Sequence, residues 1–212
     1  MVTVTIQHLL NSKDFIFICN SRIVNLLGKY VYLKMKSHKG MRPHDIAILL
    51  KIISLADNDW LNKDLAGSLF ISPSEISESL SRSAFSGLLA ADKKTVNKPA
   101  LMGFLVNGLK YMFPVQPGTV AKGTITASMA PILRDYFPAE DIYVWPELNG
   151  GTRGLVIEPL YPGAIKASKQ DPMLYDLLAL CDVFRVGKPK EVQKAAVLLT
   201  NIFGQGDDYI SC

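Results

Sequence analysis

The sequence predicts an α+β fold that is mainly helical, and two observations support this class. Between residues 42 and 113, apolar residues recur at the three- and four-residue spacing of helices packed against one another. Between residues 114 and 163, the chain holds six glycines and seven prolines, which favour turns and short strands. Two amphipathic segments follow and are expected to form the closing helices.

The composition is that of a folded protein, because 49% of the 212 residues are hydrophobic and 20% are charged. Uninterrupted apolar runs reach only about five residues, far below the length that spans a bilayer, so we expect no membrane partner. The cysteines Cys19, Cys181 and Cys212 are widely spaced, which favours reduced thiols and a cytoplasmic location.

The net charge of +4 is distributed unevenly along the chain. Residues 1–40 carry a balance of +5, residues 41–113 a balance of +1, and residues 114–212 a balance of −2. The basic excess therefore lies in the first forty residues, and overall charge does not by itself indicate a nucleic-acid partner.

Residues 1–41 are interpreted as an N-terminal extension without clean periodicity. An alternative stays open, in which translation of the native protein begins at Met35 or Met41, where the pattern becomes orderly. Mass spectrometry decides between the two, because a native peptide from residues 2–34 excludes the later start.

The segment from residue 42 to 113 predicts four helices separated by short turns. The first begins near Pro43 and is apolar on most of its surface, and the second is "KDLAGSL". Ser72 caps the third helix in a capping-box arrangement with Glu75, and Gly87 ends it. The stretch "LLAADKKTVNK" predicts a short strand, a polar turn and a return before the fourth helix, "KPALMGFLVNGLKYMF".

The segment from residue 114 to 212 predicts a hairpin followed by two helices. In "VWPELNGGTRGLVIEPL", the Asn149-Gly150 dipeptide is typical of a tight hairpin turn, and Trp145 is expected in the core. The helices are "DPMLYDLLALCDVF" and "KEVQKAAVLLTNIF". The apolar stripe of the last helix is expected to belong to the core, with a homodimer seam as the second interpretation.

Residue types associated with catalysis or metal binding do not form recognisable patterns. All three histidines lie within the first 44 residues, so the main body lacks the histidine of a Ser-His-Asp or Cys-His site. Zinc-type Cys/His groupings and phosphate-binding loops are also missing from the sequence. We therefore expect no enzyme activity, no cofactor and no metal.

The order of packing and capping residues from Leu65 to Leu89 matches a helix-turn-helix. Leu65-Ala66 and Leu69 pack in one helix, Ser72 caps the next, and Gly87-Leu88-Leu89 leads into a wing. This run resembles the winged helix proteins of the multiple-antibiotic-resistance regulator type (MarR-like) over residues 60 to 98. The resemblance implies that the helix after Ser72 reads DNA.

Three further strings resemble a less characterised bacterial helix-turn-helix family over most of residues 42–203. They are "ALMGFLVNGLKYMFPV", "VWPELNGGTRGLVIEPLYP" and "DPMLYDLLALCDVFRVG". The sequence departs from the MarR-like pattern in its shortened wing and in lacking obvious long dimerising helices. We interpret residues 42–113 as a winged helix-turn-helix domain and residues 114–212 as a small Gly/Pro-rich hairpin-plus-helices domain for dimerisation or partner binding.

The candidate DNA-contacting residues lie on the third helix and in the shortened wing. Serine hydroxyls can donate to phosphate oxygens and base edges, arginine can contact phosphate or guanine, and glutamate can accept from cytosine. Lysines in the wing can contact the phosphate backbone. The set is Ser72, Ser74, Ser77, Glu78, Ser81, Arg82, Lys93 and Lys94.

These observations predict a sequence-specific transcriptional regulator, a repressor, whose partners are double-stranded DNA and a second copy of the chain. The alternative is a protein-interaction module, such as the antitoxin or regulatory subunit of a toxin–antitoxin or defence operon, whose partner is the product of an adjacent gene. The near-neutral balance of residues 41–113 and the glutamates of the third helix favour this alternative.

Overall fold

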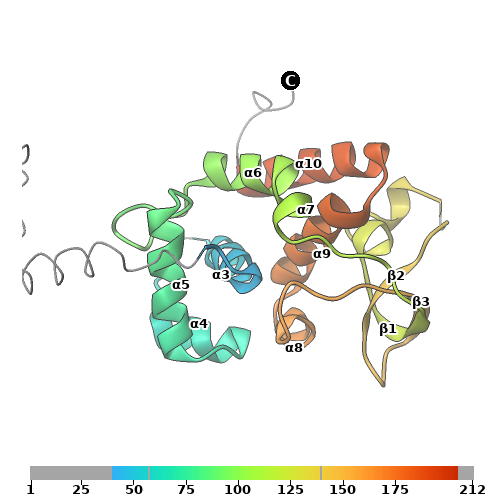
Figure 1. Cartoon of the computed structure of the whole chain (residues 1–212), viewed down its shortest axis with the longest axis horizontal. Helices are drawn as coiled ribbons and strands as arrows, with labels where there is room; N and C mark the ends of the chain where they lie inside the picture. The colour runs from blue at the N-terminus through green and yellow to red at the C-terminus, as the bar shows by residue number, and fades with distance from the viewer. Residues whose placement is uncertain (1–39, 57, 139, 205–212) are drawn as a thin grey trace, which may run out of the picture. The chain divides into compact units, whose positions relative to one another are not determined.

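The computed structural model describes residues 40–56, 58–138 and 140–204. These residues form a mainly helical α+β unit with one small sheet, in agreement with the class that the sequence predicts (Figure 1). Apart from Gly40 and Met41, the N-terminal extension and the question of its start lie outside the described residues. Within the described part of the chain, every helix is too short or too polar to cross a membrane.

Helices precede and follow the sheet. The first group is α3 (Pro43–Ser54), α4 (Asn62–Leu69), α5 (Pro73–Phe85), α6 (Lys98–Asn107) and α7 (Leu109–Met112). The strands are β1 (Val120–Thr126), β2 (Tyr143–Pro146) and β3 (Thr152–Val156), with the short 3₁₀ turns η1 (Ala127–Met129) and η2 (Arg134–Tyr136) between β1 and β2. The last group is α8 (Ala164–Gln170), α9 (Pro172–Val186) and α10 (Pro189–Phe203).

The three strands close into a small barrel, and this corrects the hairpin expected around Asn149-Gly150. β1 pairs antiparallel with β2 and with β3, whereas β2 and β3 are parallel neighbours. The connection between β2 and β3 therefore does not reverse the chain but crosses β1 at Gly123. A Cβ placed on Gly150 would lie 2.4 Å from the Gly123 Cα, so Gly150 permits a close backbone approach.

A central helix, α9, organises the core. It packs against α3, α6, α7, α8 and α10, and nine of its residues are buried. Lys51 of α3 reinforces the contact with α9, because its Nζ lies 2.7 Å from the carboxylate of Asp171, the residue that caps α9. The amino-acid composition changes between residues 113 and 114, but one continuous hydrophobic core includes residues from both sides of this point.

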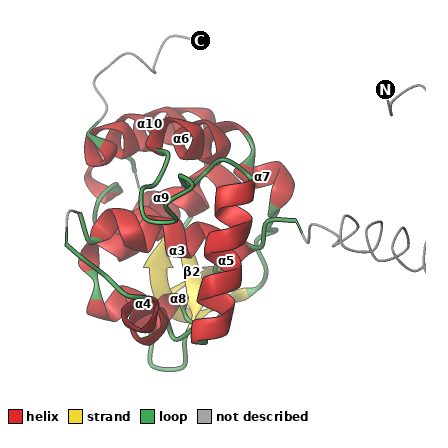
Figure 2. Ribbon diagram, turned by 90° about the vertical axis from the view of Figure 1, so that its left-hand side faces the viewer, coloured by secondary structure: helices red, strands yellow, loops and turns green. Residues whose placement is uncertain are grey.

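The two closing helices and the burial of Trp145 confirm what the sequence predicts. Trp145 is 1% exposed, and α9 and α10 cover the two amphipathic segments. Helix α8, by contrast, was not anticipated, and it packs against α4 and α9. Figure 2 shows α6 and α10 side by side above α9, while α4 and α8 lie together at the other end of α9.

Candidate functional site

The turn between α4 and α5 is built by a left-handed residue and a capping serine. Phe70 ends α4 with φ 56° and ψ 41°, and the Ile71 N–H donates to the Ala66 carbonyl at 3.1 Å. Ser72 then caps α5, because its Oγ accepts the Glu75 N–H at 3.3 Å. The cap predicted at Ser72 is confirmed, but the Glu75 side chain turns to other partners and does not complete a capping box.

The outward face of α5 carries small hydroxyl side chains and one acidic residue. Ile76 and Leu80 bury the opposite face, whereas Ser74, Ser77 and Ser81 are exposed, as is Glu78, whose side chain is 64% exposed. In Figure 1, α5 lies at the edge of the described unit farthest from the sheet. This face is therefore accessible along most of the helix.

The segment after α5 forms a short hairpin-like turn that docks on the same face. Leu89 and Val96 make an isolated antiparallel bridge, and the Ala90 N–H donates to the Thr95 carbonyl at 2.8 Å. Lys93 lies at the tip in a left-handed conformation with φ 56°. Its Nζ donates to Ser81 Oγ at 3.0 Å, which joins the turn to α5 and brings one lysine to the serine face.

Lys94, the next residue of the turn, is held by Trp60. Its Nζ donates to the Trp60 carbonyl at 2.5 Å and lies 4.0 Å from the centroid of the Trp60 ring. A cation over an aromatic ring gains electrostatic stabilisation from the ring face. Lys94 is thus engaged within the fold, although its residue remains exposed to solvent.

Arg82, expected among the DNA-contacting residues, is instead buried within the fold. The residue is only 7% exposed, and its guanidinium makes a two-pronged contact with Asp45, with Nε and Nη2 at 2.9 and 2.7 Å from the carboxylate oxygens. Nη2 also donates to Glu75 Oε1 at 2.6 Å. Because Asp45 is fully buried in α3, the arginine balances a charge that would otherwise be costly inside the core.

Further groups extend this contact into a charged cluster between α3 and α5. Arg42 Nη1 lies 3.0 Å from Glu75 Oε1, and His44 Nε2 lies 2.8 Å from the same oxygen. Burial alone raises the pKa of Glu75, but hydrogen bonds from Arg82 and His44 outweigh it and lower the pKa to about 2. Glu75 is therefore ionised at neutral pH and helps to fasten the two helices.

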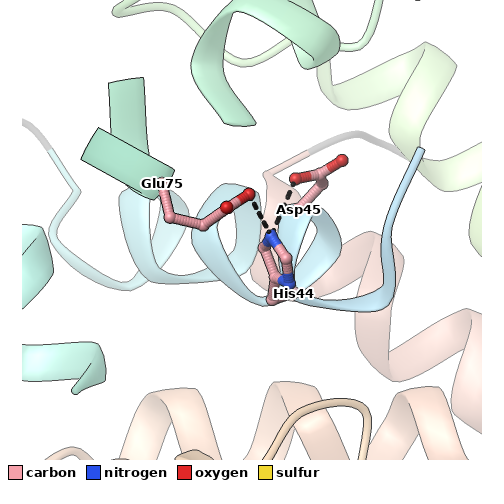
Figure 3. A group of neighbouring side chains, drawn as sticks. All are labelled: His44, Asp45 and Glu75. Atoms are coloured by element: carbon pink, nitrogen blue, oxygen red, sulfur yellow. Dashed lines mark hydrogen bonds and ion pairs between the residues drawn. The ribbon is translucent and has the colours of Figure 1, made fainter. Parts of the chain in front are cut away.

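The side chains of His44, Asp45 and Glu75 converge closely enough to resemble a metal site (Figure 3). Their potential ligand atoms lie within 4.8 Å of one another. The Arg82 guanidinium, however, contacts both carboxylates and lies 3.2 Å from His44 Nε2. A metal ion would have to displace this cation, so we assign the cluster to the joining of α3 and α5.

The structure thus brings together only part of the predicted contact set. Ser77, Ser81 and Lys93 gather on one face, Glu78 is exposed beside them, and Ser72 and Ser74 lie at the start of the helix, 3.3 Å apart at their hydroxyls. The sequence reasoning missed the partners of Arg82. A signal for them existed, because Asp45 immediately precedes a run of five apolar residues and needed a cation nearby.

Comparisons with family models, with curated proteins and with solved structures found no match for this chain. The resemblance to MarR-like proteins therefore stays a prediction from the sequence.

Proposed function

We propose that residues 42–113 form a winged helix-turn-helix domain and that the protein is a sequence-specific DNA-binding regulator of transcription, acting as a repressor. The order of α3, α4, α5 and the Leu89–Val96 turn agrees with that motif. A homodimer in the cytoplasm is the form in which we expect it to act, with each copy contacting one half-site.

One observation carries this proposal, namely the accessible face of α5 with Lys93 beside it. Ser77 and Ser81 are small, so they permit close approach of the helix to a groove and can hydrogen-bond with base edges or phosphates. The Lys93 Nζ, which donates to Ser81 Oγ, supplies a cation beside these serines for a phosphate contact. Arg82 has no part in this contact because Asp45 and Glu75 hold it inside the fold.

The test is fluorescence anisotropy with duplexes taken from the DNA upstream of the protein's own gene, at several salt concentrations. We expect saturable binding that Ser77→Glu abolishes and that Lys93→Ala weakens across all sequences. Loss of one phosphate contact reduces the slope of log K against log salt by about 0.9. Lys190→Ala is the matched control, because Lys190 is an exposed lysine on α10, outside the α5 face.

Two results would count against DNA binding. One is the absence of binding by the folded wild-type chain to any upstream duplex at moderate salt. The other is an affinity for DNA that is the same in Ser77→Glu, in Lys93→Ala and in the control Lys190→Ala. Arg82→Ala is unsuitable as a test, because removing the partner of a buried aspartate affects folding itself.

A second candidate function is recognition of a protein, as in an antitoxin that neutralises the product of an adjacent gene. The α5 face carries little positive charge. Glu78 is exposed on it, Arg82 is held inside the fold by Asp45, and the Lys94 ammonium group is bound to Trp60. Surfaces for DNA are usually strongly basic, so this observation favours a protein partner.

Co-purification of the full chain with the neighbouring gene product distinguishes this candidate. A complex that survives high salt and is disrupted by Ser77→Glu supports a protein partner on the α5 face. Failure to co-purify contradicts the antitoxin function and leaves DNA binding untouched. Both functions can coexist, since one face can serve the partner and the DNA in turn.

A further inference from the structure

The crossing of the β2–β3 connection over β1 leaves a hollow of about 440 Å³ on the barrel. Gly123, Gly150 and Gly151 line it and contribute no side chains, so the space remains open where the two backbone segments meet. The barrel lies at the opposite side of the described unit from α5 (Figure 1). The hollow is therefore separate from the proposed DNA-binding face.

Three charged side chains border the hollow. Glu147 is fixed by an ion pair with Lys169 of α8 and by the Thr124 hydroxyl, which donates to its Oε2 at 2.8 Å. Arg134 stands nearby, with its side chain 62% exposed and its Nε 3.7 Å from Asp135 Oδ1. That separation exceeds a hydrogen bond, so the planar donors of Arg134 stay open to a ligand. Among the lining residues Glu147 and Lys169 cancel, so Arg134 is the one unbalanced charge there, and its ion-pair neighbour Asp135 does not line the hollow.

Apolar groups form the remaining wall. Met129, Ile125 and Tyr175 are half-buried residues that line the hollow. The Tyr175 hydroxyl already donates to the Ile125 carbonyl at 2.7 Å, so the contact that it offers to a ligand is the ring. A ligand that suits this site has one anionic group for the charged border and a compact apolar body for the wall.

We propose that this hollow binds a small organic monocarboxylate, with its carboxylate at Arg134 and Lys169 and its apolar part against Met129 and Tyr175. Arginine pairs with a planar carboxylate through two parallel hydrogen bonds, which fixes the orientation of the acid. Because the Glu147–Lys169 pair is neutral, Arg134 balances only one negative charge, which disfavours phosphate and other dianions. The site is independent of what the α5 face binds.

Isothermal titration calorimetry on the full chain tests this inference with hexanoate, hexanamide and inorganic phosphate as probes. Hexanoate is expected to bind, while hexanamide and phosphate bind at least about tenfold more weakly, because each lacks one feature of the fit. Arg134→Gln is expected to weaken hexanoate binding by about tenfold or more. Arg153→Gln is the matched control, since Arg153 is an exposed arginine on β3 that does not line the hollow.

Gly151→Ala provides a second variant that does not depend on charge. A Cβ at Gly151 meets no atom within 4 Å, so we expect the fold to be retained, and a methyl group added at this lining position is expected to hinder the acid. Circular dichroism and the melting temperature establish that each variant is folded. The inference is overturned if hexanoate does not bind at millimolar concentration, if hexanamide or phosphate binds as tightly, or if Arg134→Gln binds like the wild type.

Discussion

The helical region, residues 40–107, and the barrel region, residues 120–160 with α9, both bury a carboxylate next to an arginine, but with opposite arrangements. In the helical region Arg82 is the centre, and it collects Asp45 from α3 and Glu75 from its own helix. In the barrel region Asp182 of α9 is the centre. It accepts hydrogen bonds from Trp145 Nε1 at 2.7 Å, Thr126 Oγ1 at 2.8 Å and Arg185 Nη1 at 2.8 Å.

This difference determines how each region responds to charge. Arginine only donates hydrogen bonds, so the cluster around Arg82 depends on carboxylates that stay ionised. Burial raises the pKa of Asp182, despite its hydrogen bonds and Arg185, whereas the cations around Glu75 lower the pKa of that carboxyl. The helical region therefore depends on carboxylates held ionised by several cations, whereas the barrel region surrounds Asp182 with one cation, Arg185, and two neutral donors, Trp145 and Thr126.

The largest effect is expected from Arg82→Ala. It removes the guanidinium from the buried Asp45, which among the described residues keeps only the Arg42 backbone N–H at 2.8 Å and His44 at 3.6 Å. Breaking a buried ion pair destabilises a protein by about 3–5 kcal/mol, and urea denaturation followed by circular dichroism measures the loss. Glu78→Ala is the control, because Glu78 is exposed and lies 3.6 Å from Arg82, and it should change stability by less than about 0.5 kcal/mol. Similar losses for the two variants would mean that the cluster does not depend on Asp45.

The next effect isolates the backbone crossing of the barrel region. Gly150→Ala forces a Cβ to within 2.4–2.5 Å of backbone atoms of Gly123, and we expect a loss of about 3 kcal/mol in the free energy of unfolding. Gly151→Ala, one residue later, meets open space and should change stability by less than about 0.5 kcal/mol. The same urea measurement applies, and equal tolerance of both alanines would contradict the crossing.

These two regions also show what a sequence can predict. The helices and the cap at Ser72 followed from local spacing, because apolar periodicity and capping act within a few residues. The burial of Arg82 did not follow, since its main partner Asp45 lies 37 residues away and only the packing of α3 on α5 brings them together. The exposed serines could be placed on one face from the helical period, but Lys93 joins them only through the conformation of the turn.

The barrel was predicted less well, because the Asn149-Gly150 motif fits either a hairpin turn or a connection that crosses another strand. Asn149-Gly150 is typical of a tight hairpin turn, and local propensity favours that structure. The parallel pairing of β2 with β3 depends on β1, which ends at Thr126, before the η1 and η2 turns and the start of β2 at Tyr143. Helix α8 was missed for a related reason, since its small buried residues Ala164 and Ala167 give a weak hydrophobic signal.

Acidification separates the two arrangements. The pKa of Glu75 is about 2 in the folded chain and 4.5 as an ordinary value, so its stabilisation is complete above pH 4.5 and disappears as the pH falls towards 2. We expect a loss of about 2 kcal/mol over this window, and a shallower pH dependence in Glu75→Gln. Asp182→Asn provides the contrast, because a raised folded pKa means that protonation of Asp182 favours the folded state.

Urea denaturation at pH 5, 4 and 3 measures this difference. If Glu75→Gln loses stability with acid as steeply as the wild type, other carboxylates carry the acid sensitivity. If Asp182→Asn removes the acid sensitivity instead, Asp182 and not Glu75 is the carboxylate whose protonation destabilises the fold. Either result would contradict the difference between the Arg82 cluster and the Asp182 cluster.

The smallest effect concerns a glycine of the helical region, where close approach is not required. Gly103 lies in the interior of α6, and a Cβ there meets no atom within 4 Å, in contrast to Gly150. Since alanine favours a helix over glycine by about 1 kcal/mol, Gly103→Ala should stabilise the chain by up to that amount in urea denaturation. Gly67→Ala in α4 has similarly open surroundings and is the matched control.

A loss of stability in Gly103→Ala alone would indicate that a second copy of the chain packs against this part of α6. Dilution of the protein would then abolish the difference in stability between the two variants.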